Sequence, residues 1–185
     1  MQYCKTVMTK KGVACLLRSA TAADASDMVR LFNQTHEETD FLLTYPDETT
    51  HMAEKEAEFL GNTEKSENAI EIFAVVDGQP VGTAGIQPIG SKYKVRHRAD
   101  FGISVLKAYW GRGIGRALTE ACIECARSAG YRQLELEAVA ANETALSLYR
   151  SCGFVEYGRN PLGFRSRVSG WQEVVLMRLD LAPEE

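Results

Sequence analysis

The chain has 185 residues, of which 45% are hydrophobic and 25% charged, with a formal net charge of −4. These values are typical of one soluble globular domain, which we expect to span residues 1–185 and to bury a core without metal or disulfide staples. The acidic balance argues against nucleic acid as the main partner. No apolar run approaches the ~18 residues of a membrane span, so we expect no membrane partner.

The N-terminal stretch 1–17 has charged residues but no continuous apolar core of the kind that a signal peptide carries. We therefore expect a cytoplasmic protein. In a reducing compartment, free thiols are the default state of an odd number of cysteines. The chain has five: Cys4, Cys15, Cys122, Cys125 and Cys152.

The first seventy residues predict one strand and two helices. Residues 14–20 read as a short strand, after which Thr21 begins a helix with Asp24 as an acidic variant of the capping box. That helix is expected to end near Thr35 and to bury four apolar residues: Ala25, Met28, Val29 and Phe32. A loop over 36–49 and a second helix over 49–62, ending at Gly61, follow.

The centre of the chain changes to a strand pattern. Residues 71–76, the turn pair Asp77-Gly78 and residues 80–89 predict a β-hairpin. Residues 92–105 continue as a third strand, which alternates basic and apolar residues at its start. Alternating charge on a strand indicates an exposed face, although these cations could also meet the outer phosphates of a cofactor or an acidic protein.

A glycine-rich turn precedes the longest predicted helix. Apolar residues at three-four spacing run from Ile114 to Ala129, and Gly130 ends the helix where a C′ glycine is expected. Residues 132–140 then predict a strand, and 142–153 a helix with Asn142 as its N-cap. Residues 154–159 and 171–181 read as two closing strands joined by a long basic loop over 159–171. Phe164 and Trp171 of this loop could line an acceptor cleft.

The element order is therefore βαα–βββ–αβ–αββ, an α/β (α+β) fold in which helices pack on a mixed sheet. Within it, the glycine run YWGRGIGRAL at 109–118 lies between a strand and a long helix. Glycine costs roughly 0.5–1 kcal/mol relative to alanine inside an element, so three glycines in five positions need a reason. Backbone N–H groups at a helix N-terminus bind anions well, although a simple strand-to-helix corner is an alternative. The run is no Walker A loop, and Arg116 breaks the dinucleotide fingerprint.

Two linked motifs resemble the GNAT superfamily of N-acetyltransferases. That family carries a Gln/Arg-x-x-Gly-x-Gly/Ala loop after its fourth strand and an Asn-x-x-Ala-x-x-x-Tyr-x-x-x-Gly-Phe helix after its fifth. The matching residues here are Trp110, Gly113, Gly115, Asn142, Ala145, Tyr149, Gly153 and Phe154. The resemblance covers about residues 70–180. Trp110 departs from the common Gln or Arg and looks like the branches with ribosomal-protein, spermidine and amino-acid acetyltransferases.

The resemblance implies a GNAT-like acyl-CoA N-acyltransferase fold and acetyl-CoA as cofactor, with no metal. The pyrophosphate would bind the loop residues Gly111, Arg112, Gly113, Ile114, Gly115 and Arg116. The pantetheine arm would pair with the strand residues Ile103, Ser104 and Val105 as an added strand, where one amide could polarise the thioester carbonyl. Asn142 would also contact pantetheine, a role compatible with helix capping.

Tyr149 is the expected catalytic acid, because a phenol near the sulfur can protonate the departing thiolate. Its alternative role is core packing in the helical stripe of 145–152. A base is needed because an alkyl ammonium has a pKa near 10. Asp100 is the first candidate by its place in the family pattern, with His97, Glu137 or a water relay as alternatives.

The same resemblance divides the chain into an acceptor-side start (13–70), an acetyl-CoA-binding core (71–158) and a C-terminal loop and strand (159–185). The expected reaction is direct attack by a primary amine on acetyl-CoA in a ternary complex. The acceptor is a small-molecule amine or a peptide N-terminus, and an edge strand near the C-terminus allows a homodimer. The competing interpretations are a non-catalytic acyl-CoA sensor and a nucleotide-binding interaction protein.

Two further patterns were weighed for chemistry. Cys122 and Cys125 lie on the apolar side of one predicted helix, so core packing is preferred to a metal site or a nucleophile. Segment 36–71 holds eleven acids against two lysines, a formal charge of −9. This field could attract a cationic amine, or it could simply reflect solvated helix faces.

Overall fold

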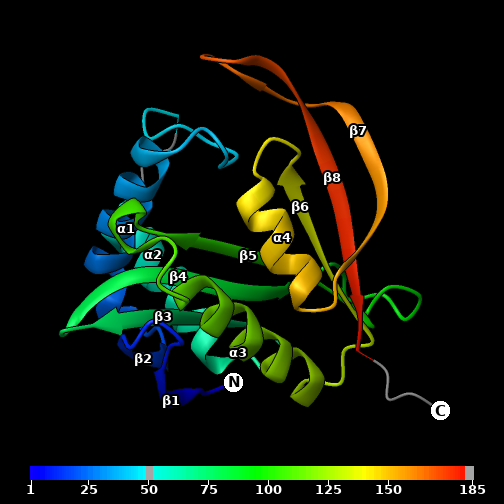
Figure 1. Ribbon diagram of the computed structural model, residues 1–185. Helices are drawn as coiled ribbons and strands as arrows, with labels where there is room; N and C mark the ends of the chain where they lie inside the picture. Colours follow the sequence, from blue (N-terminus) through cyan, green and yellow to red (C-terminus); the bar gives the residue numbers. More distant parts are fainter. Residues whose placement is uncertain (49–51, 182–185) are drawn as a thin grey trace.

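A computed structural model describes residues 1–48 and 52–181. Its strands form a single eight-stranded sheet in the order β1-β2-β3-β4-β5-β6-β8-β7 (Figure 1). The strands are β1 Cys4–Met8, β2 Ala14–Ser19, β3 Ile70–Val76, β4 Gln79–Pro88, β5 Arg98–Val105, β6 Gln133–Val139, β7 Val155–Ser166 and β8 Gly170–Asp180. The helices are η1 Ala22–Asp24, α1 Ala25–Glu38, α2 Ala53–Lys65, η2 Lys107–Tyr109, α3 Ile114–Ser128 and α4 Glu143–Ser151. The predicted mixed α/β class and element order are confirmed, with β1 added in front.

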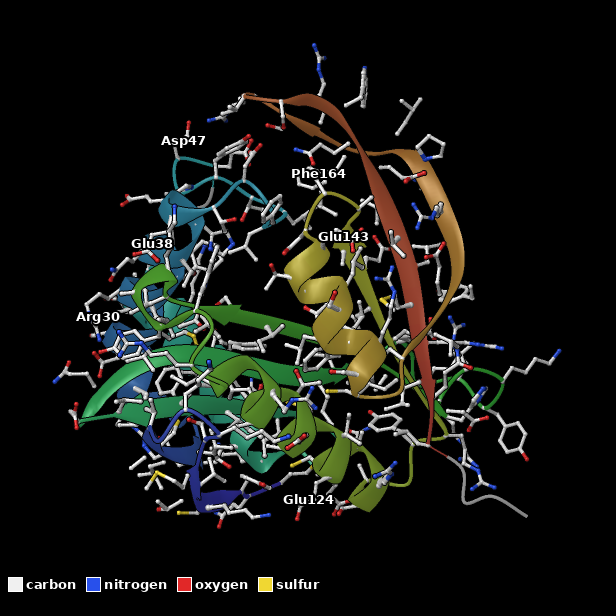
Figure 2. All side chains as sticks on the ribbon, in the orientation of Figure 1. Arg30, Glu38, Asp47, Glu124, Glu143 and Phe164 are labelled. Atoms are coloured by element: carbon white, nitrogen blue, oxygen red, sulfur yellow. The ribbon has the colours of Figure 1, made fainter. Side chains whose placement is uncertain are left out.

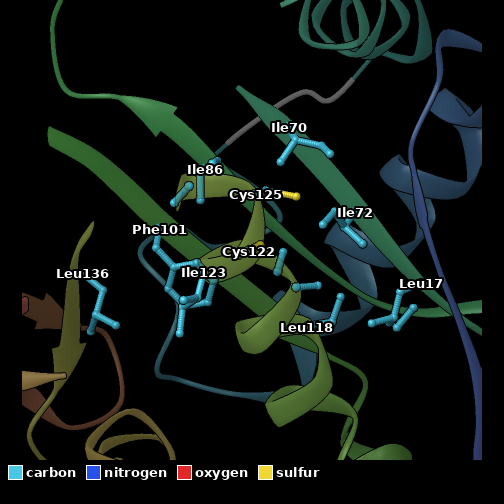
Figure 3. Packing of buried hydrophobic residues seen from close by; sticks show 14 of the residues in the cluster. Leu17, Ile70, Ile72, Ile86, Phe101, Leu118, Cys122, Ile123, Cys125 and Leu136 are labelled. Carbon is cyan, nitrogen blue, oxygen red and sulfur yellow. The ribbon is translucent and has the colours of Figure 1, made fainter. Parts of the chain in front are cut away.

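Helices cover both faces of the sheet. Figure 1 shows α3 and α4 in front of the strands and α1 and α2 behind them. On the front face, Leu118 and Cys122 of α3 pack over Ile72 and Ile86, with Phe101 beside them (Figure 3). Because β3 is covered on both faces, its sequence IEIFAVV reads as a nearly continuous apolar run.

The first helix is longer than predicted. The capping box is present, since the Thr21 amide donates to the Asp24 carboxylate at 2.8 Å, but α1 continues to Glu38, through residues expected to be loop. It buries Leu31 and Thr35 where Val29 and Phe32 were expected, and these two are only half-buried. The predicted helical face was therefore rotated by about one residue.

The second helix also differs from its prediction. It begins at Ala53 and passes through Gly61 to Lys65, so Gly61 is not its end. A Cβ at Gly61 would lie 3.7 Å from that of Ala22, an ordinary contact, and the helix backbone continues there undistorted. The predicted start at residue 49 lies outside the described residues.

Residues 92–97 form turns and not the start of the third strand. The amide of Val95 donates to the Lys92 carbonyl at 2.9 Å, and that of Arg98 to the Val95 carbonyl at 3.0 Å, before β5 begins. Residues 92–97 thus lie at the opposite end of β5 from the glycine run, about 26 Å away at the rise of a strand. That separation removes the suggested contact with a cofactor's outer phosphates.

The predicted loop over 159–171 is wrong, because β7 continues to Ser166 and β8 begins at Gly170, giving a long hairpin. The ladder shifts register between Asn160 and Phe164, a segment that contains Pro161. Proline lacks the N–H that a ladder needs and is tolerated at bulges on edge strands such as β7. The Asn, Pro and Gly residues that resemble a loop in the sequence are the residues of this bulge.

Candidate active site

The sheet opens between its two parallel strands. β5 and β6 pair only from Arg98–Asp100 with Gln133–Glu135, although β5 continues to Val105 and β6 to Val139. The Leu106 amide donates to the Val81 carbonyl of β4 at 2.9 Å. Since backbone groups alternate in direction along an antiparallel strand, those of Phe101, Ile103 and Val105 face the gap.

The exposed edge of β5 therefore offers a short row of main-chain groups. Trp110 occupies one of them, because its indole N–H donates to the Val105 carbonyl at 2.6 Å. The amide and carbonyl of Ile103 and the amide of Val105 remain directed into the gap. Ser104 differs from the other two predicted residues, since it pairs with Thr83 and its backbone faces β4.

The glycine run forms the turn from η2 into α3. Gly111 and Gly113 have φ values of +69° and +89°, which side chains other than glycine's rarely adopt. Gly113 is the N-cap of α3, so the amides of its first turn have no partner within the helix. Along the described chain, none of the amides of 111–116 donates to a protein acceptor. Six unpartnered amides at the positive end of a helix dipole favour an anion.

The two arginines of this loop are placed differently. Arg112 is exposed and stacks at 5.0 Å on the ring of Tyr109, which leaves its N–H groups accessible. Arg116 instead connects two helices, because its guanidinium donates to the Ser151 hydroxyl of α4 and lies 3.4 Å from Glu120. Arg112 is therefore the more available partner for a phosphate.

Helix α4 brings Asn142 and Tyr149 toward the same region. The Asn142 side chain accepts the Ala145 amide at 3.2 Å, which is the predicted capping role. Tyr149 is 8% exposed and contacts Phe101 of β5 edge to face, with ring centroids 6.2 Å apart. Burial, with a smaller contribution from Cys152, raises the pKa of Tyr149 to about 12. The phenol thus keeps its proton at neutral pH and can donate it.

The candidate bases lie on the other face of the sheet. Phe101 faces Tyr149, so its neighbour Asp100 points to the α1 and α2 side. Desolvation, followed by the charges of Glu137 and Glu135, raises the pKa of Asp100. Glu135 itself is bound by Arg98, with an N–O distance of 2.7 Å, whereas Asp100 and Glu137 form no ion pair within the described residues.

His97 lies apart from these carboxylates. It is exposed in the turn before β5 and not on the strand, as the sequence had indicated. Its carbonyl accepts the amides of Arg132 and Gln133 at 2.9 and 3.2 Å, at the end of the sheet where β5 and β6 still pair. The gap lies beyond that pairing, next to Asp100.

A hollow of 470 Å³ lies on the acceptor side, between three segments far apart in sequence. It is lined by Asp40, Phe41, Ala140, Ala141, Ser169, Trp171, Gln172 and Glu173. Trp171, proposed from the sequence as a lining residue, is among them; Phe164 is not, because it lies half-buried on β7 opposite Gln172. No sequence motif marks Asp40 and Phe41, and only the fold brings them to the site.

Many acids of segment 36–71 already have partners. Glu38 accepts the Lys107 amide at 2.6 Å, and Asp47 and Glu48 both pair with Arg167. Glu71 accepts a hydrogen bond from the Thr83 hydroxyl, and burial raises its pKa to about 7. The field available to a cationic acceptor is therefore smaller than the sequence count of −9 indicates.

The cysteines and helices give no sign of metal or membrane sites. Cys122 and Cys125 are buried on α3 within the apolar core. Among the residues with assigned positions, no group of three or more His, Cys, Asp or Glu side chains could hold a metal ion. Over the same residues, no helix combines the length and apolar character needed to cross a membrane.

Residues 25–154 match the sequence profile described as the acetyltransferase (GNAT) family. The chain belongs to this family. A GNAT acetyltransferase structure from Streptococcus pneumoniae is 32% identical, with a TM-score of 0.85 over 89% of this chain and 98% of that one. Another GNAT-fold structure, the acetyltransferase yncA from Salmonella typhimurium, was solved with acetyl-CoA; it is 19% identical, with a TM-score of 0.81 over 92% and 95% of the two chains.

Among curated relatives, this GNAT chain is 37% identical over 101 residues to the N-alpha-acetyltransferase RimI of Mycobacterium tuberculosis. The match covers 55% of this chain and 60% of that relative. Three other curated relatives are covered over at most 42% of their length. The similarity therefore identifies the family, and leaves the acceptor to be argued from the site.

Proposed function

We propose that this chain transfers an acetyl group from acetyl-CoA to a primary amine by direct attack in a ternary complex. The observation that carries the proposal is the continuous set of unpartnered backbone groups, which begins on the open edge of β5 and ends at the start of α3. A thioester with a diphosphate arm matches both parts. Membership of the GNAT family supports the same conclusion.

The residues fit the cofactor in two places. Amides of 111–116, with Arg112 beside them, would hold the pyrophosphate, while Ile103 and Val105 would pair with the pantetheine amides as an added strand. Asn142 is near enough in the fold to contact the same arm. Bound acetyl-CoA would supply an activated carbonyl, and an amide of the β5 edge would polarise it.

The proton steps are assigned to the two faces of the sheet. An ammonium acceptor has to lose a proton before its nitrogen can attack, and Asp100 is placed on the acceptor face to take it. Its raised pKa makes it a better base than an ordinary aspartate, and Glu137 is the alternative. Tyr149, on the cofactor face, would give its proton to the thiolate that leaves.

Other parts of the proposal concern the whole chain. We assign residues 13–70 to the acceptor side, 71–158 to the cofactor-binding core, and 159–185 to the closing hairpin. The outer edge of β7 could pair with a second copy, because it is an edge strand with exposed Val155 and Leu162. A cytoplasmic location would give the enzyme access to acetyl-CoA.

The test is a screen of primary amines with acetyl-CoA, in which free thiol release is followed and products are identified by mass. We expect turnover with at least one amine and tight binding of coenzyme A in calorimetry. Binding of coenzyme A without any acetylated product would favour the non-catalytic sensor. Binding of ATP or NAD in its place would indicate the nucleotide-binding alternative.

A further inference from the structure

Two segments far apart in sequence close over the acceptor hollow. One is the loop 40–48 after α1, and the other is the turn 166–170 at the end of the β7–β8 hairpin; together we call them the acceptor clamp. Figure 1 shows the hairpin extending over the open side of the molecule toward this loop. Residues of both segments, Asp40 and Ser169, line the hollow.

Asp40 is the centre of the clamp's hydrogen bonds. Its carboxylate accepts the hydroxyls of Ser166 at 2.5 Å and Ser169 at 2.9 Å, the Tyr45 hydroxyl at 2.9 Å and the Gln172 amide at 3.3 Å. These hydrogen bonds, led by that of Ser166, lower the pKa of Asp40. Four donors around one carboxylate hold it in place, so Asp40 has little capacity left for a substrate cation.

Arg167 ties the outer side of the clamp. Its guanidinium lies 2.7 Å from the Asp47 carboxylate and 3.0 Å from that of Glu48, and it stacks at 4.3 Å on the Tyr45 ring. Its amide also donates to the Tyr45 hydroxyl at 2.8 Å. Figure 2 shows Asp47 on this loop, beside the end of the hairpin. A single exposed ion pair contributes little, but a forked, stacked pair within a network fixes geometry.

The hollow under the clamp has a size and lining that restrict its occupant. Its 470 Å³ falls within the range of about 300–1,000 Å³ typical of sites for small ligands. Trp171 and Phe41 supply apolar surface, while Glu173 is engaged by Arg159 at 2.7 Å. A chain passing through would need the groove open at both ends, and the bonds of Asp40 and Arg167 join its two walls.

We propose that the acceptor clamp makes the enzyme selective for a primary amine presented at the end of a molecule, and excludes a lysine within a polypeptide. The inference rests on the proposed acetyl transfer and names the acceptor class of that site. A small free amine and a peptide N-terminus share this chemistry. Arg167 and Asp40 are its specificity-determining residues, and neither takes part in the proton steps.

The experiment compares three acceptors: 2-phenylethylamine, a lysine-free tetrapeptide with a free N-terminus, and an N-terminally blocked peptide with one central lysine. We expect the wild-type kcat/KM for the better end-on amine to exceed that for the blocked peptide at least 100-fold. The first two acceptors distinguish a small-molecule source from a peptide source. Equal kcat/KM for all three would overturn the inference.

Arg167→Ala should reduce this ratio at least tenfold by admitting the blocked peptide, and Asp40→Asn should act in the same direction. The matched control is Arg96→Ala, since Arg96 also stacks on a tyrosine, at 4.5 Å from Tyr93, but lies in the 92–97 turns. An unchanged ratio in both clamp variants contradicts the inference. Arg167→Lys, which keeps the charge but loses the fork, replaces Arg167→Ala if that protein does not fold.

A binding readout separates this inference from the proposed activity. Trp171 becomes the only tryptophan in a Trp110→Phe background, and its fluorescence reports entry of an amine without turnover. Binding of end-on amines alone, relaxed by Arg167→Ala, would support the clamp even if no thiol were released. Thiol release with unchanged binding selectivity in the variants would retain the enzyme and reject the clamp.

Discussion

The two sides of the candidate site are built by different means. The cofactor side consists of main-chain groups from neighbouring stretches, the β5 edge and the 111–116 turn, with positive φ at Gly111 and Gly113. The acceptor side consists of side chains from three distant segments, joined by bonds such as that of Asp40 to Ser166. A backbone site needs particular residues at fixed spacing, whereas a side-chain site can be assembled from many sequences.

The sharpest test of the cofactor side is Tyr149→Phe. Removing the phenolic proton should lower kcat about 100-fold, within the range of general acid catalysis, and leave the Kd for acetyl-CoA unchanged. Steady-state kinetics and calorimetry measure the two quantities. The ring contact with Phe101 survives in the variant, so a purely structural role for Tyr149 would leave kcat unaltered and reassign the proton donor.

On the acceptor side, Asp100→Asn should lower kcat/KM about 30-fold, since Glu137 remains as a partial replacement. The raised pKa of Asp100 means that its base form disappears, as pH falls, above the usual aspartate value of about 3.9. The wild-type pH profile should therefore show an acidic limb, absent in the variant. Glu137→Gln is the paired variant, and loss of the limb there instead would exchange the two roles.

These two residues also mark how far the sequence could lead. Tyr149 follows from motif spacing, because a helix after the predicted strand fixes its distance from the gap. The face on which Asp100 lies follows from strand alternation. What no pattern indicated was the pairing of Asp40 and Arg167, since a contact between residues 127 positions apart depends on how the hairpin β7–β8 closes.

The errors in the fold have a common cause. The bulge around Pro161 and the interior Gly61 carry residues that usually end elements, and the tertiary structure accommodates both. Conversely, the alternating residues of 92–97 resemble a strand but lie beyond the last residue of β6 with which β5 pairs. Local composition predicts where a chain prefers to turn, and the sheet decides whether it does.

A smaller effect is expected from Gly113→Ala, which tests whether the cofactor side depends on backbone shape. A side chain at a φ of +89° costs about 1–2 kcal/mol, and its Cβ would lie 3.1 Å from that of Thr9. We expect about tenfold weaker binding of acetyl-CoA in calorimetry. Gly130→Ala is the matched control, because φ is +79° with no neighbour within 4 Å. Equal losses of affinity in both variants would point to general destabilisation.

The smallest effect concerns the acids of the acceptor side. Because several of them are paired, raising salt from about 0.05 M to about 0.5 M should increase the KM of a cationic amine only about threefold. An amino acid acceptor with no net charge is the control and should show a flat response. A flat response for the cationic amine as well would remove steering from the account.

The open edge of β5 has a consequence for how the enzyme would respond to its own product. The contacts assigned to the 111–116 amides and to Ile103 involve the diphosphate and pantetheine, which are the same before and after the acetyl group leaves. Free coenzyme A should thus compete on nearly equal terms with its acetylated form. Turnover would follow the ratio of the two in the cell, more than the concentration of either.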